Sequence, residues 1–253
     1  AVPDLIQALQ DEDGYVRYSA AGALGNIGKD AKDAVPALIL ALQGSVGVLR
    51  ENAAKALRNI GKDAKDAIPA LILALQDKVG NVRGSAAEAL GSIGKGSEDV
   101  VPALIQALKD PDSHVRHSAA EALGQTGSAD AVSALTQTLK DPDSHVRHSV
   151  AEALGQTGSA DAVPALKIAL QDQDSWVRAA ATEALQSINT RFARSIGNNN
   201  IGNSGEIFDP KYVAGTTGNA GLMAFTRALG GHSLDDNIQP RGLHHHPIHD
   251  PTW

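Results

Sequence analysis

An eighteen-residue stretch occurs twice in this 253-residue chain with a single change. Residues 110–127 read DPDSHVRHSAAEALGQTG, and residues 141–158 repeat them with Val150 in place of Ala119. Repetition at a fixed period indicates one structural unit used many times. Weaker copies appear when the chain is aligned on a valine-arginine pair. The landmark arginines are spaced by 33, 33, 33, 31 and 31 residues, and they are Arg17, Arg50, Arg83, Arg116, Arg147 and Arg178.

Each copy predicts two helices. The first half reads V-P-A-L-I-x-A-L, and in the fourth copy apolar residues recur at Val101, Leu104, Ile105 and Leu108, which is one face of a helix. The second half reads V-R-x-x-A-x-x-A-L-x-x-I-G, which predicts a helix ended by glycine, or by Asn189 in the sixth copy. We call these helix A and helix B. Such short pairs bury their apolar stripes only by stacking. The predicted repeats are 1–28, 34–61, 67–94, 100–127, 131–158 and 162–189.

The motif D-P-D-x-x-V-R-x-x-A-x-x-A-L-G resembles HEAT repeats, specifically the short phycobilisome-lyase HEAT-like repeats, over about residues 1–189. The resemblance implies an all-α fold: a right-handed α-solenoid of six two-helix repeats. It also implies a structural ladder of aspartates and arginines between repeats rather than a set of ligand-binding arginines. The second copy has Gly44 in place of the aspartate and Leu49 in place of valine, which predicts a looser joint there. The implied pairs are Asp11 with Arg17, Asp77 with Arg83, Asp110 with Arg116, Asp141 with Arg147, and Asp172 with Arg178, while Arg50 has no aspartate in its own copy.

A candidate binding face follows from the positions that vary between copies. Residues one, five and nine places after each landmark arginine share one stripe of helix B, because they are spaced by four. The core positions hardly change while this stripe does, so we expect a concave face that binds a protein partner through a basic or polar segment. The candidate residues, called here the helix-B stripe, are Tyr18, Asn26, Glu51, Lys55, Glu88, His117, Glu121, Gln125, His148, Glu152, Gln156 and Glu183.

A metal site is the alternative for part of this stripe. His117 and His148, with Glu121 and Glu152, belong to neighbouring copies and carry side chains that ligate metals. HEAT-repeat di-iron hydroxylases bind their metal through His-Glu dipeptides, and this chain has none. Duplication of one unit explains the paired histidines more simply. We therefore predict solvated histidines, no metal, no cofactor and no catalytic residue.

Composition restricts the partners further. The chain has 29 acidic against 22 basic side chains and no cysteine. An acidic balance disfavours a phosphate-binding surface, so no nucleic-acid partner is expected. No apolar run approaches the ~18 residues that cross a bilayer, so no membrane partner is expected and we predict a cytoplasmic protein.

Residues 190–253 break the period and predict a largely irregular tail with one short helix near 220–229. Residues 201–236 resemble an active-site segment of short-chain dehydrogenases, in which Tyr212 matches the acid/base tyrosine. Thr216 stands where that family has its lysine, which implies a vestigial fragment without activity.

Three functions are therefore considered. The first is a non-catalytic protein-interaction scaffold. The alternative is a subunit or helper of a bilin lyase, which attaches or removes a chromophore on a phycobiliprotein, and the third is a vestigial oxidoreductase fragment.

Overall fold

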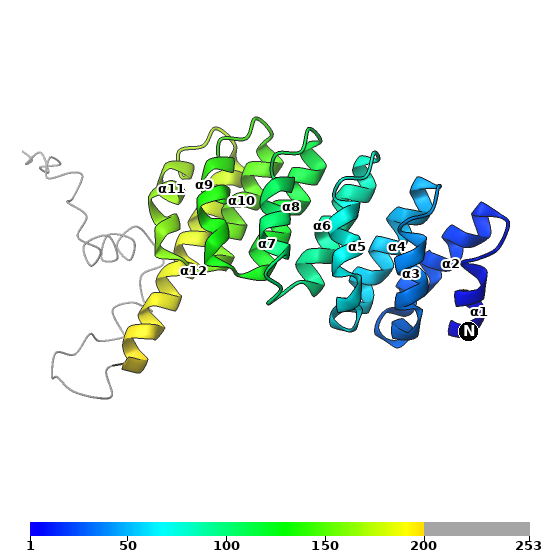
Figure 1. Cartoon of the computed structure of the whole chain (residues 1–253). Helices are drawn as coiled ribbons and strands as arrows, with labels where there is room; N and C mark the ends of the chain where they lie inside the picture. Colours follow the sequence, from blue (N-terminus) through cyan, green and yellow to red (C-terminus); the bar gives the residue numbers. More distant parts are fainter. Residues whose placement is uncertain (200–253) are drawn as a thin grey trace, which may run out of the picture. The chain divides into compact units, whose positions relative to one another are not determined.

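A computed structural model describes the backbone of residues 1–199 and the side chains of residues 1–194. These residues form two rows of helices, with no strand among them, which confirms the all-α prediction (Figure 1). The A helices are α1 (Val2–Ala8), α3 (Val35–Ala41), α5 (Ile68–Ala74), α7 (Val100–Ala107), α9 (Val132–Thr138) and α11 (Val163–Ala169). The B helices are α2 (Gly14–Ile27), α4 (Gly47–Ile60), α6 (Gly80–Ile93), α8 (Ser113–Thr126), α10 (Ser144–Thr157) and α12 (Ser175–Asn199).

Short 3-10 helices connect most repeats and account for the change of period. The first two connections are the seven-residue segments η1 (Gly28–Ala34) and η2 (Gly61–Ala67). The last two are the three-residue segments η3 (Ala129–Ala131) and η4 (Ala160–Ala162). The two residues that separate the periods of 33 and 31 are therefore lost in these connections and not in the paired helices.

Local sequence signals fix most helix ends. Asp112 and Asp143 cap α8 and α10 by accepting hydrogen bonds from the backbone N–H of His114 and His145 at 2.9 and 2.8 Å. Gly127 ends α8 in the left-handed conformation, with φ of 66°. The five glycines that end B helices were expected to be left-handed, because glycine takes that conformation without strain. Gly158 is also left-handed, but Gly28 and Gly61 combine positive φ with ψ of −129° and −141°, and Gly94 has φ of −84°, so the expectation is wrong at three of the five.

The prediction that the last helix ends at Asn189 is wrong. Helix α12 continues to Asn199, ten residues further. Asparagine ends a helix only weakly, and residues 190–196 contain neither glycine nor proline. The extension also packs on the preceding B helix, where Arg191 Nη1 donates to the carbonyl of Gln156 at 2.8 Å. The predicted tail helix and the dehydrogenase-like segment lie outside the described residues.

A fully buried leucine of each B helix lies at the centre of the core. Each B helix packs against the next B helix and against the A helix of its own repeat. The B-helix leucines lie at the same position of every repeat and are 0–1% exposed, and complete burial of one leucine contributes about 1.5–3 kcal/mol. They are Leu24, Leu57, Leu90, Leu123, Leu154 and Leu185.

The B helices approach most closely where a glycine faces an alanine of the next helix. A Cβ atom built on Gly124 would lie 2.9 Å from Ala153 Cα, and one on Gly155 would lie 2.7 Å from Ala184 Cα. No side chain larger than hydrogen fits at these crossings without a shift of the helices. Repeat 2 departs, because Arg58 occupies the equivalent position.

Replacing Gly124 by alanine is expected to lower the free energy of unfolding by about 1–3 kcal/mol, through overpacking. The matched control is Gly22→Ala, where the nearest atom to the new Cβ is Asn52 Nδ2 at 3.8 Å. That variant should be unchanged or more stable by about 0.5–1 kcal/mol, since alanine favours helix over glycine. Urea unfolding followed by circular dichroism measures both. An equal loss in the two variants would show that the close crossing does not matter.

Candidate functional site

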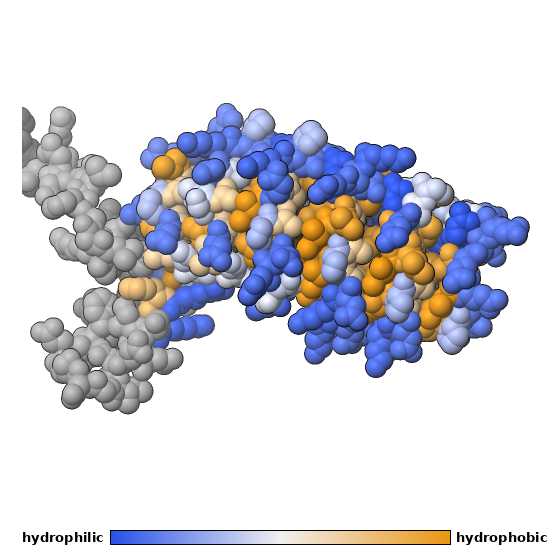
Figure 2. Space-filling view, viewed as in Figure 1, coloured by the Kyte–Doolittle hydropathy of each residue, from blue (hydrophilic) through white to orange (hydrophobic). Residues whose placement is uncertain are grey.

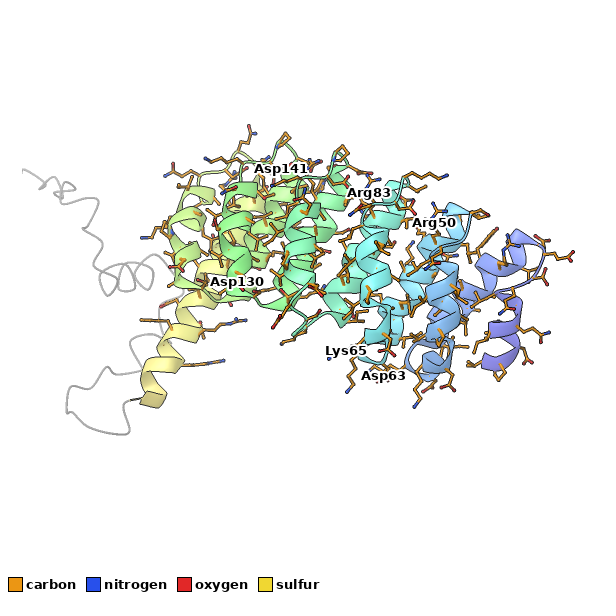
Figure 3. All side chains as sticks on the ribbon, viewed as in Figure 1. Arg50, Asp63, Lys65, Arg83, Asp130 and Asp141 are labelled. Carbon is orange, nitrogen blue, oxygen red and sulfur yellow. The ribbon has the colours of Figure 1, made fainter. Side chains whose placement is uncertain are left out.

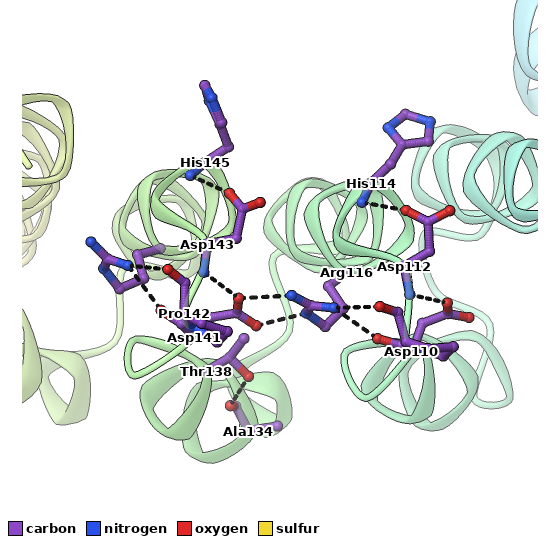
Figure 4. A network of polar contacts seen from close by, with 12 residues as sticks. Asp110, Asp112, His114, Arg116, Ala134, Thr138, Asp141, Pro142, Asp143 and His145 are labelled. Carbon is purple, nitrogen blue, oxygen red and sulfur yellow. Dashed lines mark hydrogen bonds and ion pairs between the residues drawn. The ribbon is translucent and has the colours of Figure 1, made fainter.

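The most regular polar feature of the array is an arginine that joins two repeats. Arg116 donates from Nε and Nη2 to the carboxylate oxygens of Asp141 in the following repeat, at 2.7 and 2.9 Å (Figure 4). Its Nη1 donates to the carbonyl oxygens of Asp110 and Pro111 in its own repeat, at 2.9 and 3.2 Å. One guanidinium thus uses three nitrogens and bridges two units. The guanidinium of Arg116 and the carboxylate of Asp141 are both largely buried, and this planar, two-bond pairing compensates their charges.

Three further joints carry the same bond. They involve Arg50 with Asp77, Arg83 with Asp110, and Arg147 with Asp172, with donor–acceptor distances of 2.6–2.9 Å. Figure 3 shows that Arg50, Arg83 and Asp141 lie along the same edge of the array.

The predicted pairing within each repeat is wrong. From repeat 3 onward, each ladder aspartate side chain contacts the arginine of the preceding repeat, and only its carbonyl oxygen contacts the arginine of its own repeat. The carboxylate is held in this direction by a local turn, because Asp110 Oδ1 also accepts the backbone N–H of Asp112 at 2.9 Å. The carbonyl is then left facing forward to Arg116.

Burial and the arginine bond act on the ladder carboxylates in opposite directions. Arg147 and Asp172 are 8% and 13% exposed. The hydrogen bonds from Arg147 lower the pKa of the Asp172 carboxyl, and partial burial opposes them. The pKa of Asp77 is likewise lowered, first by its bonds to Arg50.

The ladder is interrupted between repeats 1 and 2. Arg17 donates Nη1 to the carbonyls of Asp11 and Glu12 at 2.6 and 2.8 Å, as the other arginines do in their own repeats. The next repeat offers Gly44, so Arg17 has no carboxylate partner among the described residues. Arg50 keeps its ion pair, because its partner Asp77 belongs to repeat 3. The predicted looseness of this joint stays a prediction.

All twelve residues of the helix-B stripe are half-buried or exposed. Four of them are glutamates at the same position of consecutive helices, five residues after the landmark arginine. Glu88 is engaged by Arg58 in an ion pair and by Ser118 Oγ at 3.5 Å. Within residues 1–194, the other three glutamates form no bond to lysine or arginine, and they are Glu121, Glu152 and Glu183.

The remaining stripe residues make few strong contacts. Lys55 Nζ lies 2.5 Å from Glu51 Oε1 within one helix. The ring of Tyr18 packs edge-on against Tyr15 with centroids 5.0 Å apart. Asn26, Gln125 and Gln156 have exposed side chains, which leaves them available to a partner.

The histidines stay with the glutamates of their own helices. His117 Nε2 lies 3.4 Å from Glu121 Oε1, and His148 Nε2 lies 3.8 Å from Glu152 Oε1. His117 Nδ1 forms a 2.8 Å hydrogen bond with Ser149 Oγ of the next helix. Within the part of the chain that the structure describes, no three histidine, aspartate or glutamate side chains are placed to hold a metal ion.

Two contact residues were not predicted from the sequence. They are Ser149, which bonds to His117, and Arg58, which pairs with Glu88. The sequence does single out Arg58, because it is a large cation at the position where the neighbouring repeats have the glycine of the helix crossing.

Comparison with known proteins gives a consistent assignment of the repeats. A family model described as HEAT repeats matches residues 1–58, 35–121 and 101–186. The complex of CpcE and CpcF of phycocyanin lyase from Nostoc sp. PCC7120 has a chain 30% identical, with a TM-score of 0.58 over 75% of this chain and 77% of that one. An engineered protein is 28% identical, with a TM-score of 0.57 over 75% and 96%.

Other comparisons bear on the fold alone or give nothing. A designed armadillo repeat protein solved in complex with the peptide (KR)4 is 19% identical, with a TM-score of 0.59 over 74% of this chain and 99% of that one. Its likeness supports the repeat-solenoid architecture. No curated protein matches this chain. The resemblance of residues 201–236 to short-chain dehydrogenases finds no support in these comparisons. No helix within residues 1–199 is both long and apolar enough to cross a bilayer.

Replacing Asp77 by asparagine is expected to lower the free energy of unfolding by about 3 kcal/mol, since it leaves the buried Arg50 without its counter-charge. Asp11→Asn is the matched control: Asp11 Oδ1 accepts the backbone N–H of Asp13 at 2.8 Å, as Asp77 does from Val79, but it faces no arginine side chain. The control should change stability by about 1 kcal/mol or less. Chemical unfolding of both variants tests the contribution of the ladder.

The pH dependence of the same pair has a defined sign. The folded-state pKa of Asp77 lies below the unfolded value of about 3.9. The stabilisation is therefore present above the unfolded-state pKa and is lost as the pH falls through the lowered folded-state pKa. The stability difference between the wild type and Asp77→Asn should shrink over that acidic range. A difference that stays constant down to acid unfolding would argue against an ionised pair.

Proposed function

The chain belongs to the HEAT-repeat family, and we propose that it is a non-catalytic scaffold that binds an extended basic segment of a protein partner on the helix-B stripe. The single observation that carries the proposal is the row of glutamates at one position of consecutive B helices. Stacked repeats of this kind present extended surfaces rather than closed pockets. A row of equivalent carboxylates suits a partner with cations at a matching interval.

The spacing of the row suggests the conformation of the partner. Packed helices lie about 8–10 Å apart, so successive glutamates are separated by roughly that distance. A polyproline II segment advances about 3.1 Å per residue with three residues per turn, so every third side chain recurs on one side after about 9 Å. A segment with lysine at every third position would place one ammonium group against each of Glu121, Glu152 and Glu183.

Glu88 is expected to take little part. Its carboxylate is already paired with Arg58, so binding a partner lysine there would require that ion pair to break. The carboxylates of the row that have no lysine or arginine partner among the described residues therefore belong to repeats 4, 5 and 6. The amides of Gln125 and Gln156 flank them and can accept and donate hydrogen bonds to the peptide backbone.

A synthetic peptide tests this arrangement directly. Four Lys-Pro-Pro triplets with a fluorescent label should bind with a dissociation constant that rises with salt, as expected of exposed charges. Glu121→Gln combined with Glu152→Gln should weaken binding about 3- to 10-fold. The control is Asp130→Asn combined with Asp161→Asn, which makes the same change of charge in η3 and η4. Fluorescence anisotropy measures all three proteins.

The composition of the peptide provides a second control. A peptide with the same residues but with its lysines in one block has the same charge and the wrong interval. If it binds as tightly, or if the control pair of substitutions weakens binding equally, the row of glutamates is not the binding site.

The alternative function is that of a subunit or helper of a bilin lyase, favoured by the likeness to CpcE and CpcF of phycocyanin lyase. Mixing the protein with apo-phycocyanin and a free bilin discriminates the two. A covalent adduct that absorbs visible light and survives denaturation supports a lyase role. Binding to the phycobiliprotein without an adduct supports the scaffold.

A further inference from the structure

The interrupted joint of the ladder opens a cavity that leads to an arginine. The cavity lies between repeats 1 and 2, has a volume of about 310 Å³, and is lined by Leu9, Arg17, Leu40, Gly44 and Leu49 among others. Leu40 is 65% exposed, and Figure 2 shows apolar surface over the neighbouring helices α3 and α5. The guanidinium of Arg17 therefore belongs to the lining of a largely apolar cavity at the surface.

A second cavity gives the internal comparison. It occupies the equivalent place between repeats 4 and 5, and Leu108, Ala134 and Asp141 line it where Leu9, Ala37 and Gly44 line the first. There Asp141 forms part of the wall, and its partner Arg116 does not. Between repeats 1 and 2 the absent side chain of Gly44 leaves Arg17 in the wall.

Two of the three donor nitrogens of Arg17 have no partner among the residues that the structure describes. Its Nη1 is occupied by two backbone carbonyls. Its Nε and Nη2 correspond to the two donors that hold carboxylate oxygens in the other four joints. Arg17 forms no ion pair with any described residue. These donors form a fork that matches a planar carboxylate in two parallel bonds.

We propose that this cavity is a binding site for the carboxylate of a short aliphatic acid, which takes the place of the missing aspartate side chain. The guanidinium of Arg17 selects the carboxylate. Leu9, Leu40 and Leu49 surround the place of its hydrocarbon chain and favour an aliphatic over a polar one. The cavity is independent of the helix-B stripe, so this proposal does not rest on the proposed function.

Butyrate is the probe, followed through the side-chain Nε–H resonance of Arg17 in a nitrogen-15 NMR spectrum at constant ionic strength. We expect a saturable shift with a dissociation constant on the order of millimolar. Butyramide, which has the same shape without the charge, should give no such shift. Inorganic phosphate tests the anion class, and a saturable shift at lower concentration than butyrate would overturn the carboxylate assignment.

Two substitutions locate the site. Arg17→Lys loses the fork and should weaken butyrate binding at least 10-fold, measured on neighbouring backbone amides. Arg178→Lys is the control: Arg178 also binds two carbonyls of its own repeat, and it also lacks a carboxylate partner among the described residues. The control should bind butyrate unchanged. Equal loss in both variants, or none in Arg17→Lys, would overturn the proposal.

Restoring the ordinary joint should close the site. Gly44→Asp combined with Leu49→Val supplies the missing carboxylate and removes the leucine that a Cβ at position 44 would approach to 3.0 Å. Butyrate should then shift no resonance at this joint, and its persistence would contradict the proposal. If a variant fails to fold, the unmodified protein still tests the proposal. Butyrate should raise its thermal unfolding midpoint, and butyramide should not.

Discussion

The array exists because no repeat can bury its own apolar stripe. An A helix of seven or eight residues is too short to be stable alone in water. Each repeat gains a core only when its leucines meet those of the next unit. Stability is therefore a property of neighbouring pairs, and every departure from the common sequence acts at a joint rather than inside a unit.

Apolar packing and the arginine–aspartate ladder make different contributions to the assembly of the repeats. The leucines and the glycine–alanine crossings supply the contact, but similar apolar surfaces tolerate sliding. The arginine fork has a fixed geometry, and a misplaced neighbour would leave two buried charges unpaired. At the four joints that have it, the fork therefore adds to the register set by packing, and fixing register is the best attested use of a buried ion pair. The joint between repeats 1 and 2 is packed without it.

The periodic sequence predicts the helices and the leucine core well, because both follow from spacing within one unit. It does not decide which arginine an aspartate meets. Asp110 lies six residues before Arg116 and 27 after Arg83, and the aspartates of the other three ladder bonds repeat the short spacing and have a long one of 27 or 25 residues. Only the direction of the turn at residues 110–112 decides it. The stripe residues are half-buried or exposed, and their role as a binding face stays a prediction. Arg58 was not predicted because it belongs to one copy and not to the pattern.

The connections between repeats have a consequence for how such a chain can change over time. The ladder bond spans 27 residues in the early joints and 25 in the later ones, with nearly the same distances. The shortening falls in the 3-10 connections, and Figure 3 shows Asp63, Lys65 and Asp130 of these segments at the edge opposite Arg50 and Arg83. Length variation there leaves the next unit in place. Repeats 3, 4 and 5 each supply one ladder aspartate and one ladder arginine, so duplication of a whole repeat of this kind adds a complete joint. The near-identical stretches 110–127 and 141–158 are the result expected of such a duplication.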